Sequence, residues 1–201
     1  MFLEETEEDE NAEAYLELPS SEKDVYAKRM MKLLGAVSMV KKMELSSGFL
    51  EVLSQAPDLL DCQPPRLCDL QYLFLEMWYT RGCLRAIAYL CKISPHITFL
   101  SLTCKESNLV DVGDDWEAGL SFPGMLSHLK YVQIEVVEGC DAELKLLRFL
   151  LKNAENLKEV ALFFCSSVGS PDGDRQIEQF KDKLRAVVPT ASSSIQLVFE
   201  T

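Results

Sequence analysis

The chain has 201 residues, 48% of them hydrophobic, and a formal net charge of −12 at pH 7. This hydrophobic content excludes global disorder, and the length allows one domain with a substantial core or two small ones at most. The absence of a concentrated basic patch argues against a nucleic-acid ligand, and no apolar run approaches the ~20 residues that a membrane span needs.

The seven cysteines occur without a CxxC pair and are accompanied by only two histidines. This pattern does not supply a zinc site, and it is typical of reduced, mostly buried thiols when no secretory signal precedes them. We therefore expect a cytoplasmic or nuclear protein that uses no metal and no other cofactor.

The first two predicted segments are a tail and a helix. Residues 1–13, MFLEETEEDENAE, hold seven acidic side chains and no basic one, which predicts a solvated, disordered tail. Residues 21–37, SEKDVYAKRMMKLLGAV, predict a helix that opens with the capping pair Ser21 and Asp24 and carries Gly35 near its end.

A hydrophobic–xx–hydrophobic–x–hydrophobic pattern then recurs five times, starting at residues 40, 70, 97, 129 and 157. The spacings are therefore 30, 27, 32 and 28 residues. Because residues two apart in a strand share a face, the last two positions of each copy should face the core, and the first should enter it from the preceding bend. The copies are Val40/Met43/Leu45, Leu70/Leu73/Leu75, Ile97/Leu100/Leu102, Leu129/Val132/Ile134 and Leu157/Val160/Leu162.

Two weaker copies flank these five. One has Glu13 in the first position, followed by Leu16 and Leu18, and the other is a closing strand in which Ile195, Leu197 and Phe199 alternate. Apolar stripes predict helices at residues 81–94, 141–154, with Asp141 as N-cap, and 171–188.

One strand and one helix cannot bury both of their apolar faces alone, so the repeat predicts copies that stack side by side. We expect an α/β fold of the leucine-rich-repeat-like solenoid type, with a curved parallel sheet and outer helices. The competing fold is a doubly wound α/β sheet. Its strands should be continuous β-branched runs, whereas these strands keep polar residues at fixed positions.

Residues 128–164, HLKYVQIEVVEGCDAELKLLRFLLKNAENLKEVALFF, closely resemble the FBD module that ends many plant F-box proteins with leucine-rich repeats. The features that match are His128-Leu129-Lys130 at a strand start, Gly139 before a Leu-rich helix, LLKNA at 150–154, Leu157-Lys158, and PTASSS before the last strand. The resemblance covers roughly residues 37–201. We expect irregular leucine-rich repeats over residues 14–127 and FBD-like repeats over 128–201, continuous with the same solenoid.

Members of that family begin with an F-box, which docks onto the adaptor subunit of a cullin-based ubiquitin ligase. Residues 16–34, LELPSSEKDVYAKRMMKLL, have a Leu-Pro start but lack the hydrophobic pattern of an F-box. The chain therefore resembles the substrate-recognition end of such a protein. A fragment, a truncated product and an independently used module all remain open as explanations.

Catalytic and metal-binding motifs are absent from the sequence. His96 and His128 each stand just before a predicted strand, which favours a structural role for both. SPDGD at 170–174 and DVGDDWE at 111–117 lack the ligand spacing of a calcium loop. We expect no enzyme activity.

The strand pattern leaves two columns of residues facing out of the sheet. They are Lys42, Tyr72, Phe99, Tyr131 and Glu159, and Glu44, Phe74, Ser101, Gln133 and Ala161. A stripe of outward aromatics is typical of partner surfaces. The alternative is that the segment 103–128, with Trp116 and Phe122, folds over them.

The first functional hypothesis is a protein-interaction module for an unknown protein target, with no nucleic-acid or membrane partner. Ubiquitin-ligase components would be partners only if an F-box is present elsewhere. Its expected partner-binding residues are the aromatics Tyr72, Phe74, Phe99 and Tyr131 and the lysines Lys42, Lys130 and Lys158. The alternatives are a solenoid that senses a hormone-like small molecule, and a decoy that lacks ligase docking.

Overall fold

Six strands form one open parallel sheet, in an order that is also their order in the chain. The structure is a computed structural model that describes residues 20–54, 66–78, 80–104, 113, 116–119, 124–165, 171–187 and 195–200. The strands are β1 (Lys42–Leu45), β2 (Tyr72–Met77), β3 (Phe99–Cys104), β4 (Tyr131–Val137), β5 (Glu159–Phe164) and β6 (Gln196–Glu200). The predicted α/β class with a parallel sheet is therefore confirmed.

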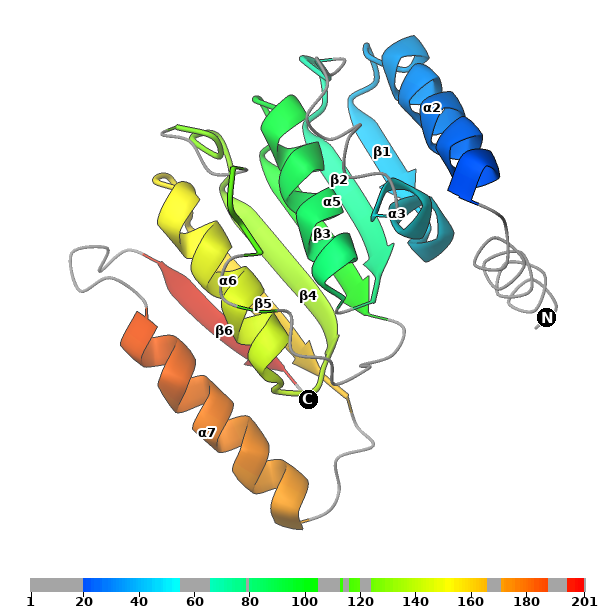
Figure 1. Ribbon diagram of the computed structural model, residues 1–201. Coiled ribbons are helices and arrows are strands. Elements are labelled where there is room, and N and C mark those ends of the chain that lie inside the picture. Colours follow the sequence, from blue (N-terminus) through cyan, green and yellow to red (C-terminus); the bar gives the residue numbers. More distant parts are fainter. Residues whose placement is uncertain are drawn as a thin grey trace, which may run out of the picture.

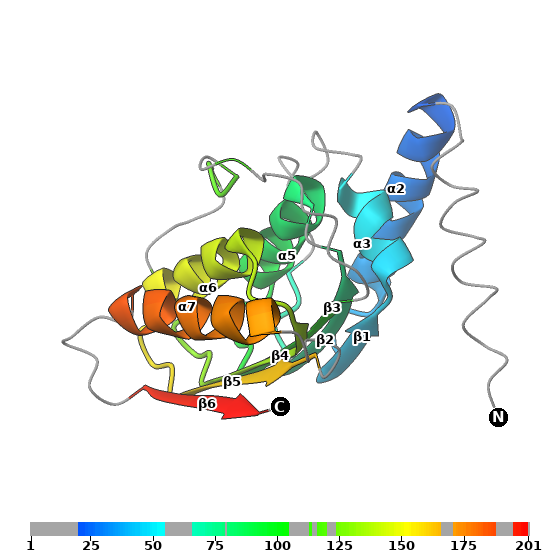
Figure 2. The ribbon, with the colours of Figure 1, turned by 90° about the horizontal axis from the view of Figure 1, so that it is seen from below.

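The described helices lie on one face of this sheet (Figures 1 and 2). They are α2 (Ser20–Ala36), α3 (Ser47–Ser54), α5 (Arg81–Ile93), α6 (Asp141–Asn153) and α7 (Pro171–Val187). A doubly wound sheet needs helices on both faces and a reversal of strand order, and the described part of the chain has neither. None of these helices combines the length and the apolar character needed to cross a membrane. We call the other face of the sheet the open face.

The strand register aligns the repeated hydrophobic positions into two rows beneath the helices. One row is Met43, Leu73, Leu100, Val132, Val160 and Leu197, and the next is Leu45, Leu75, Leu102, Ile134, Leu162 and Phe199. The members on β2 to β5 are buried, and the first positions Leu70, Ile97, Leu129 and Leu157 are buried with them. The predicted core is confirmed for the four copies on β2 to β5, whereas in the first copy Met43 is buried and Val40 and Leu45 are half-buried.

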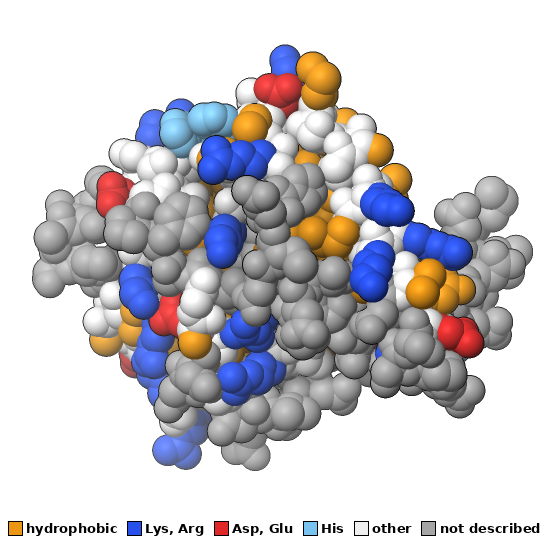
Figure 3. Space-filling view, turned by 45° about the horizontal axis from the view of Figure 1, so that its top comes forward, with side chains coloured by type: hydrophobic (Ala, Val, Ile, Leu, Met, Phe, Trp, Pro, Cys, Tyr) orange, Lys and Arg blue, Asp and Glu red, His pale blue; other side chains and the backbone are white. Residues whose placement is uncertain are grey.

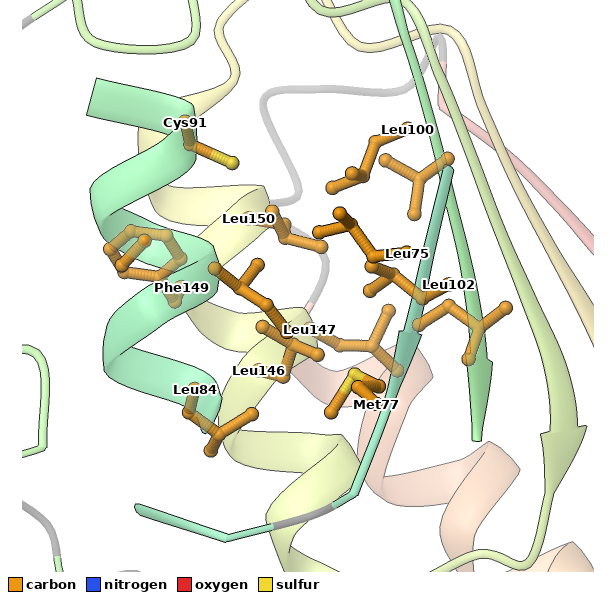
Figure 4. Close-up of a cluster of buried hydrophobic side chains, with 14 of the residues drawn as sticks. Leu75, Met77, Leu84, Cys91, Leu100, Leu102, Leu146, Leu147, Phe149 and Leu150 are labelled. Atoms are coloured by element: carbon orange, nitrogen blue, oxygen red, sulfur yellow. The ribbon is translucent and has the colours of Figure 1, made fainter. Parts of the chain in front are cut away.

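The core is completed by the inward stripes of the helices. Figure 4 shows Leu84 and Cys91 of α5 and Leu147 of α6 among leucines of β2 and β3. Each fully buried leucine contributes about 1.5–3 kcal/mol relative to an exposed one. The sheet and the helices therefore stabilise each other by burying apolar side chains that a single strand–helix unit would leave exposed.

Two helix predictions need correction. The N-cap of α6 is Cys140 rather than Asp141, because the Glu143 side chain accepts the Cys140 backbone N–H at 2.8 Å and starts the helix there. The sequence analysis did not predict helix α3, which is only eight residues long. At its start, the Ser46 carbonyl accepts hydrogen bonds from the N–H groups of Phe49 and Leu50.

Some predictions fall outside the described residues. These are the acidic tail over residues 1–13, the weak strand copy at Leu16 and Leu18, and the side chains of the capping pair Ser21 and Asp24.

Candidate functional site

The open face carries two rows of outward side chains, set by the same register that forms the core. The first row is Lys42, Tyr72, Phe99, Tyr131, Glu159 and Gln196, and the second is Glu44, Phe74, Ser101, Gln133, Ala161 and Val198. Neighbouring strands of a sheet lie about 4.8 Å apart, so neighbours within a row are close enough for their side chains to touch. The structure therefore brings the predicted aromatic residues onto one continuous surface.

The four aromatic side chains on this surface form what we call the aromatic patch: Tyr72, Phe74, Phe99 and Tyr131. The Phe99 ring centroid lies 5.5 Å from that of Phe74 and 6.3 Å from that of Tyr72. These separations are within the range of favourable aromatic pairs. Tyr72 and Tyr131 remain 45% and 41% exposed, whereas Phe74 and Phe99 are half-buried.

The predicted lysines take two different positions around the patch. The Lys42 ammonium lies 4.5 Å from the Phe74 ring centroid, a cation–π contact, and 3.9 Å from the Glu44 carboxylate. Lys130 and Lys158 are exposed and directly precede β4 and β5, at the end of the sheet where the strands begin. Lys158 also lines a hollow of about 550 Å³ together with Tyr131, Glu159 and Gln196.

Trp116 does not cover the aromatic patch. Its ring centroid lies 5.1 Å from that of Phe149 on α6, and the side chain is buried on the helix side of the sheet. Arg85 of α5 holds this segment by donating to the Trp116 carbonyl at 3.0 Å. Phe122, the other aromatic expected to provide cover, lies outside the described residues.

A polar row that was not predicted from the sequence borders the aromatic patch on the side of the carboxyl-terminal ends of the strands. Glu76, Thr103 and Glu135 are register partners on β2, β3 and β4. The Glu135 carboxylate accepts hydrogen bonds from the Thr103 hydroxyl at 3.2 Å and from the Gln133 amide at 2.8 Å. Extending the outward alternation by one more step along each strand would have found it.

His96 and His128 lie next to each other at the amino-terminal ends of β3 and β4. Their ring centroids lie 5.0 Å apart, and His128 Nδ1 lies 3.2 Å from both the Pro95 carbonyl and the Ser127 hydroxyl. Figure 3 shows the two histidines side by side, with lysine and arginine side chains nearby. Within the described ranges, no group of three or more His, Cys, Asp or Glu side chains is arranged to hold a metal ion.

The cysteines in the described ranges are not in disulfide bonds, and Cys83, Cys91, Cys104 and Cys140 are buried. Burial raises the pKa of Cys83 to about 11 and that of Cys91 to about 12. Both thiols are therefore protonated at neutral pH and unsuited to nucleophilic chemistry.

Comparison with known protein families finds a match to the family model described as FBD, over residues 122–162. The expected FBD resemblance of this region is therefore confirmed. The match covers β4, α6 and the start of β5, and it contains Tyr131, Lys130 and Lys158. No curated protein matches the chain.

Proposed function

We propose that the chain is a non-enzymatic protein-interaction module that corresponds to the substrate-recognition region of a plant F-box protein of a cullin-based ubiquitin ligase. The observation that carries this proposal is the aromatic patch on a sheet face that no described helix covers. The FBD match over residues 122–162 supports it, because FBD modules accompany F-boxes. The protein would then work in the cytoplasm or nucleus.

The finer architecture in this proposal is a leucine-rich-repeat-like solenoid. Three features support it: the copies recur every 27–32 residues, the strands are parallel and sequential, and the helices share one face. A solenoid of this kind leaves a whole sheet face free for a partner. The outward residues of all six strands can then act together as one surface.

The aromatic patch is suited to anchoring a protein partner. Tyrosine is enriched among the few interface residues whose truncation to alanine costs about 2 kcal/mol or more of binding free energy. Phe74 and Phe99 are already held by their ring contacts, so fixing them on binding costs little conformational entropy. Lys42 and the polar row at Glu135 border the apolar centre on two sides and would select partners by charge.

The small-molecule alternative finds weaker support. The hollow beside Tyr131 and Lys158 has the volume of a ligand pocket, but Glu155 and Glu159 also line it and would repel an acidic ligand. A decoy that occupies targets without delivering them to a ligase would use the same aromatic patch, so it differs from the first proposal only in the presence of an F-box.

The test compares Tyr72→Ala/Tyr131→Ala with Tyr26→Ala as the control. Tyr26 lies on α2 and is 40% exposed, so it is matched to the other two in chemistry and exposure but lies off the open face. We expect affinity capture from plant extract, read by quantitative mass spectrometry, to lose specific partners with the double variant and keep them with the control. Circular dichroism should show both variants folded. Undiminished capture by the folded double variant would contradict the proposed surface, and recovery of cullin-ligase subunits would support the ligase connection.

A further inference from the structure

Strand β1 lies at an edge of the sheet. Backbone N–H and C=O groups point outward from its outer side, which we call the free side. The strand pairs with β2, and no described strand pairs with its free side. The Lys41 carbonyl accepts N–H groups from Gln71 and Tyr72 of the neighbouring strand. Because alternate residues of a parallel strand bond to opposite neighbours, the backbone groups of Lys42 and Glu44 face the free side.

An apolar hollow lies beside this free edge. It has a volume of about 290 Å³ and lies between α2 and β1, lined by Leu33, Leu34, Val37, Val40, Met43 and Leu45, among others. Leu33 is 54% exposed and Met39 is 81% exposed. On β2 the equivalents of Met43 and Leu45, Leu73 and Leu75, are at most 2% exposed because both neighbouring strands are present. The β1 end of the core therefore combines a strand edge that no described strand pairs with and an adjoining, mainly apolar hollow, which Lys42 and Glu44 also line.

We propose that residues 15–18, Tyr-Leu-Glu-Leu, dock on the free edge of β1 as an additional parallel strand. Leu16 and Leu18 have the same two-residue spacing as Met43 and Leu45, and would fill the apolar hollow. The connection has a suitable length: a strand that ends at Leu18 leaves one residue, Pro19, before α2 begins. One residue also separates β1 from α3, and three residues separate β2 from α5 and β4 from α6.

The docked strand has a defined register. Leu16 lies beside Met43 and Leu18 beside Leu45, which sets Tyr15 beside Lys42 at the end of the first outward row. Glu17 then lies beside Glu44, and Lys42, 3.9 Å from Glu44, offsets part of their repulsion. This proposal stands on the sheet edge and the hollow, so it holds whether or not the aromatic patch binds a partner.

Amide hydrogen exchange of the full chain, followed residue by residue by NMR, tests the proposal. We expect the Lys42 and Glu44 amides to be protected in the wild type, and Leu16→Asp to lower their protection about tenfold or more. The Met43 amide faces β2 and should stay protected, which makes it an internal reference. The matched control is Tyr15→Asp, which places the same charge one residue away, on the open face beside Lys42, and should leave the protection unchanged.

Two results would overturn the proposal: rapid exchange of Lys42 and Glu44 in the wild type, or protection that Leu16→Asp leaves intact. The second result would assign the edge to another occupant, such as a second copy of the chain. If the charge also exposes Met43, the milder Leu16→Ala variant decides. It must lower protection of Lys42 and Glu44 selectively, and an unselective effect would refute the docked strand.

Discussion

Glu143 has an unusual environment for a carboxyl group, because it lies in the core. Its side chain is fully buried and accepts three backbone N–H groups, from Glu138, Gly139 and Cys140, at 2.9, 2.7 and 2.8 Å. Gly139 has a φ of +80°, a conformation that glycine adopts without strain. The carboxylate thereby fixes the turn that joins β4 to α6.

The environment of Glu143 predicts a pH-dependent stability. Burial raises the pKa of this carboxyl to about 7 from 4.5, although the three backbone hydrogen bonds lower it. A raised pKa means that the folded state binds the proton more tightly than the unfolded state. We therefore expect the free energy of unfolding to fall by about 3 kcal/mol as pH rises through the interval between 4.5 and 7.

Urea unfolding at a series of pH values measures this effect, and Glu143→Gln is the control. The variant cannot ionise, so this contribution to the pH dependence should vanish. It should also be less stable by about 1–3 kcal/mol near pH 5, because at least one buried N–H loses its acceptor. Identical pH profiles for variant and wild type would show that the pKa of Glu143 is not raised.

At the scale of the elements, α3 and α5 pack unusually closely at Gly82. A Cβ atom added at Gly82 would lie 2.7 Å from the Cβ of Ser54, closer than real Cβ contacts allow. Gly82 is the second residue of α5, and Ser54 is the last residue of α3. The glycine is therefore required by helix packing.

This packing predicts that Gly82→Ala destabilises the protein, although alanine is the better helix former. The helix gain is about 1 kcal/mol at most, whereas overpacking costs about 1–3 kcal/mol. We expect a net loss of about 1–2 kcal/mol in urea unfolding. Ser54→Gly/Gly82→Ala removes the clash and should recover most of the loss. Additive effects of the two substitutions would contradict the contact.

At the scale of the whole molecule, one hydrophobic core runs through every described repeat. It extends from Leu34 of α2 to Leu184 of α7 without a break. Each strand buries its apolar face only together with its neighbours. A destabilising substitution in one repeat should therefore destabilise the adjacent repeats as well. The matching positions Val132 and Val160 are register partners in adjacent strands, and each is at most 2% exposed.

We predict that Val132→Asp and Val160→Asp each unfold the chain, because an unpaired buried carboxylate costs several kcal/mol. The matched control is Ala161→Asp, one residue beyond Val160 on the same strand and on the open face. This control should fold and change the free energy of unfolding by less than about 1 kcal/mol. Thermal unfolding followed by circular dichroism distinguishes the control from the two valine variants. Wild-type melting of both valine variants would contradict the register.

The net charge is distributed unevenly along the chain. The described residues hold 19 Lys and Arg against 18 Asp and Glu, whereas the remaining segments hold 1 against 14. The described part is therefore nearly neutral, and the net charge of −12 is carried by the other segments. A protein partner would meet the aromatic patch without strong repulsion from the sheet and helices.

Much of this arrangement could be predicted from the sequence because strand and helix periodicities are local. The two-residue alternation placed Val132 and Ile134 in the core and Tyr131 and Gln133 outside it. It could do so because one face of each strand is apolar in every copy. The sequence alone therefore determined the six strands, the helices other than α3, the core rows of β2 to β5 and the residues of the aromatic patch.

Other features were decided only by tertiary contacts. The sequence left open whether Trp116 would cover the aromatic patch, and its burial against Phe149 of α6 places it on the helix side. The Cys140 cap depends on the Glu143 carboxylate, and the Thr103–Gln133–Glu135 hydrogen bonds depend on which side chains the register sets side by side. The physical reason is that hydrophobic periodicity states which face a residue takes, whereas packing and hydrogen bonding between distant segments select its neighbours on that face.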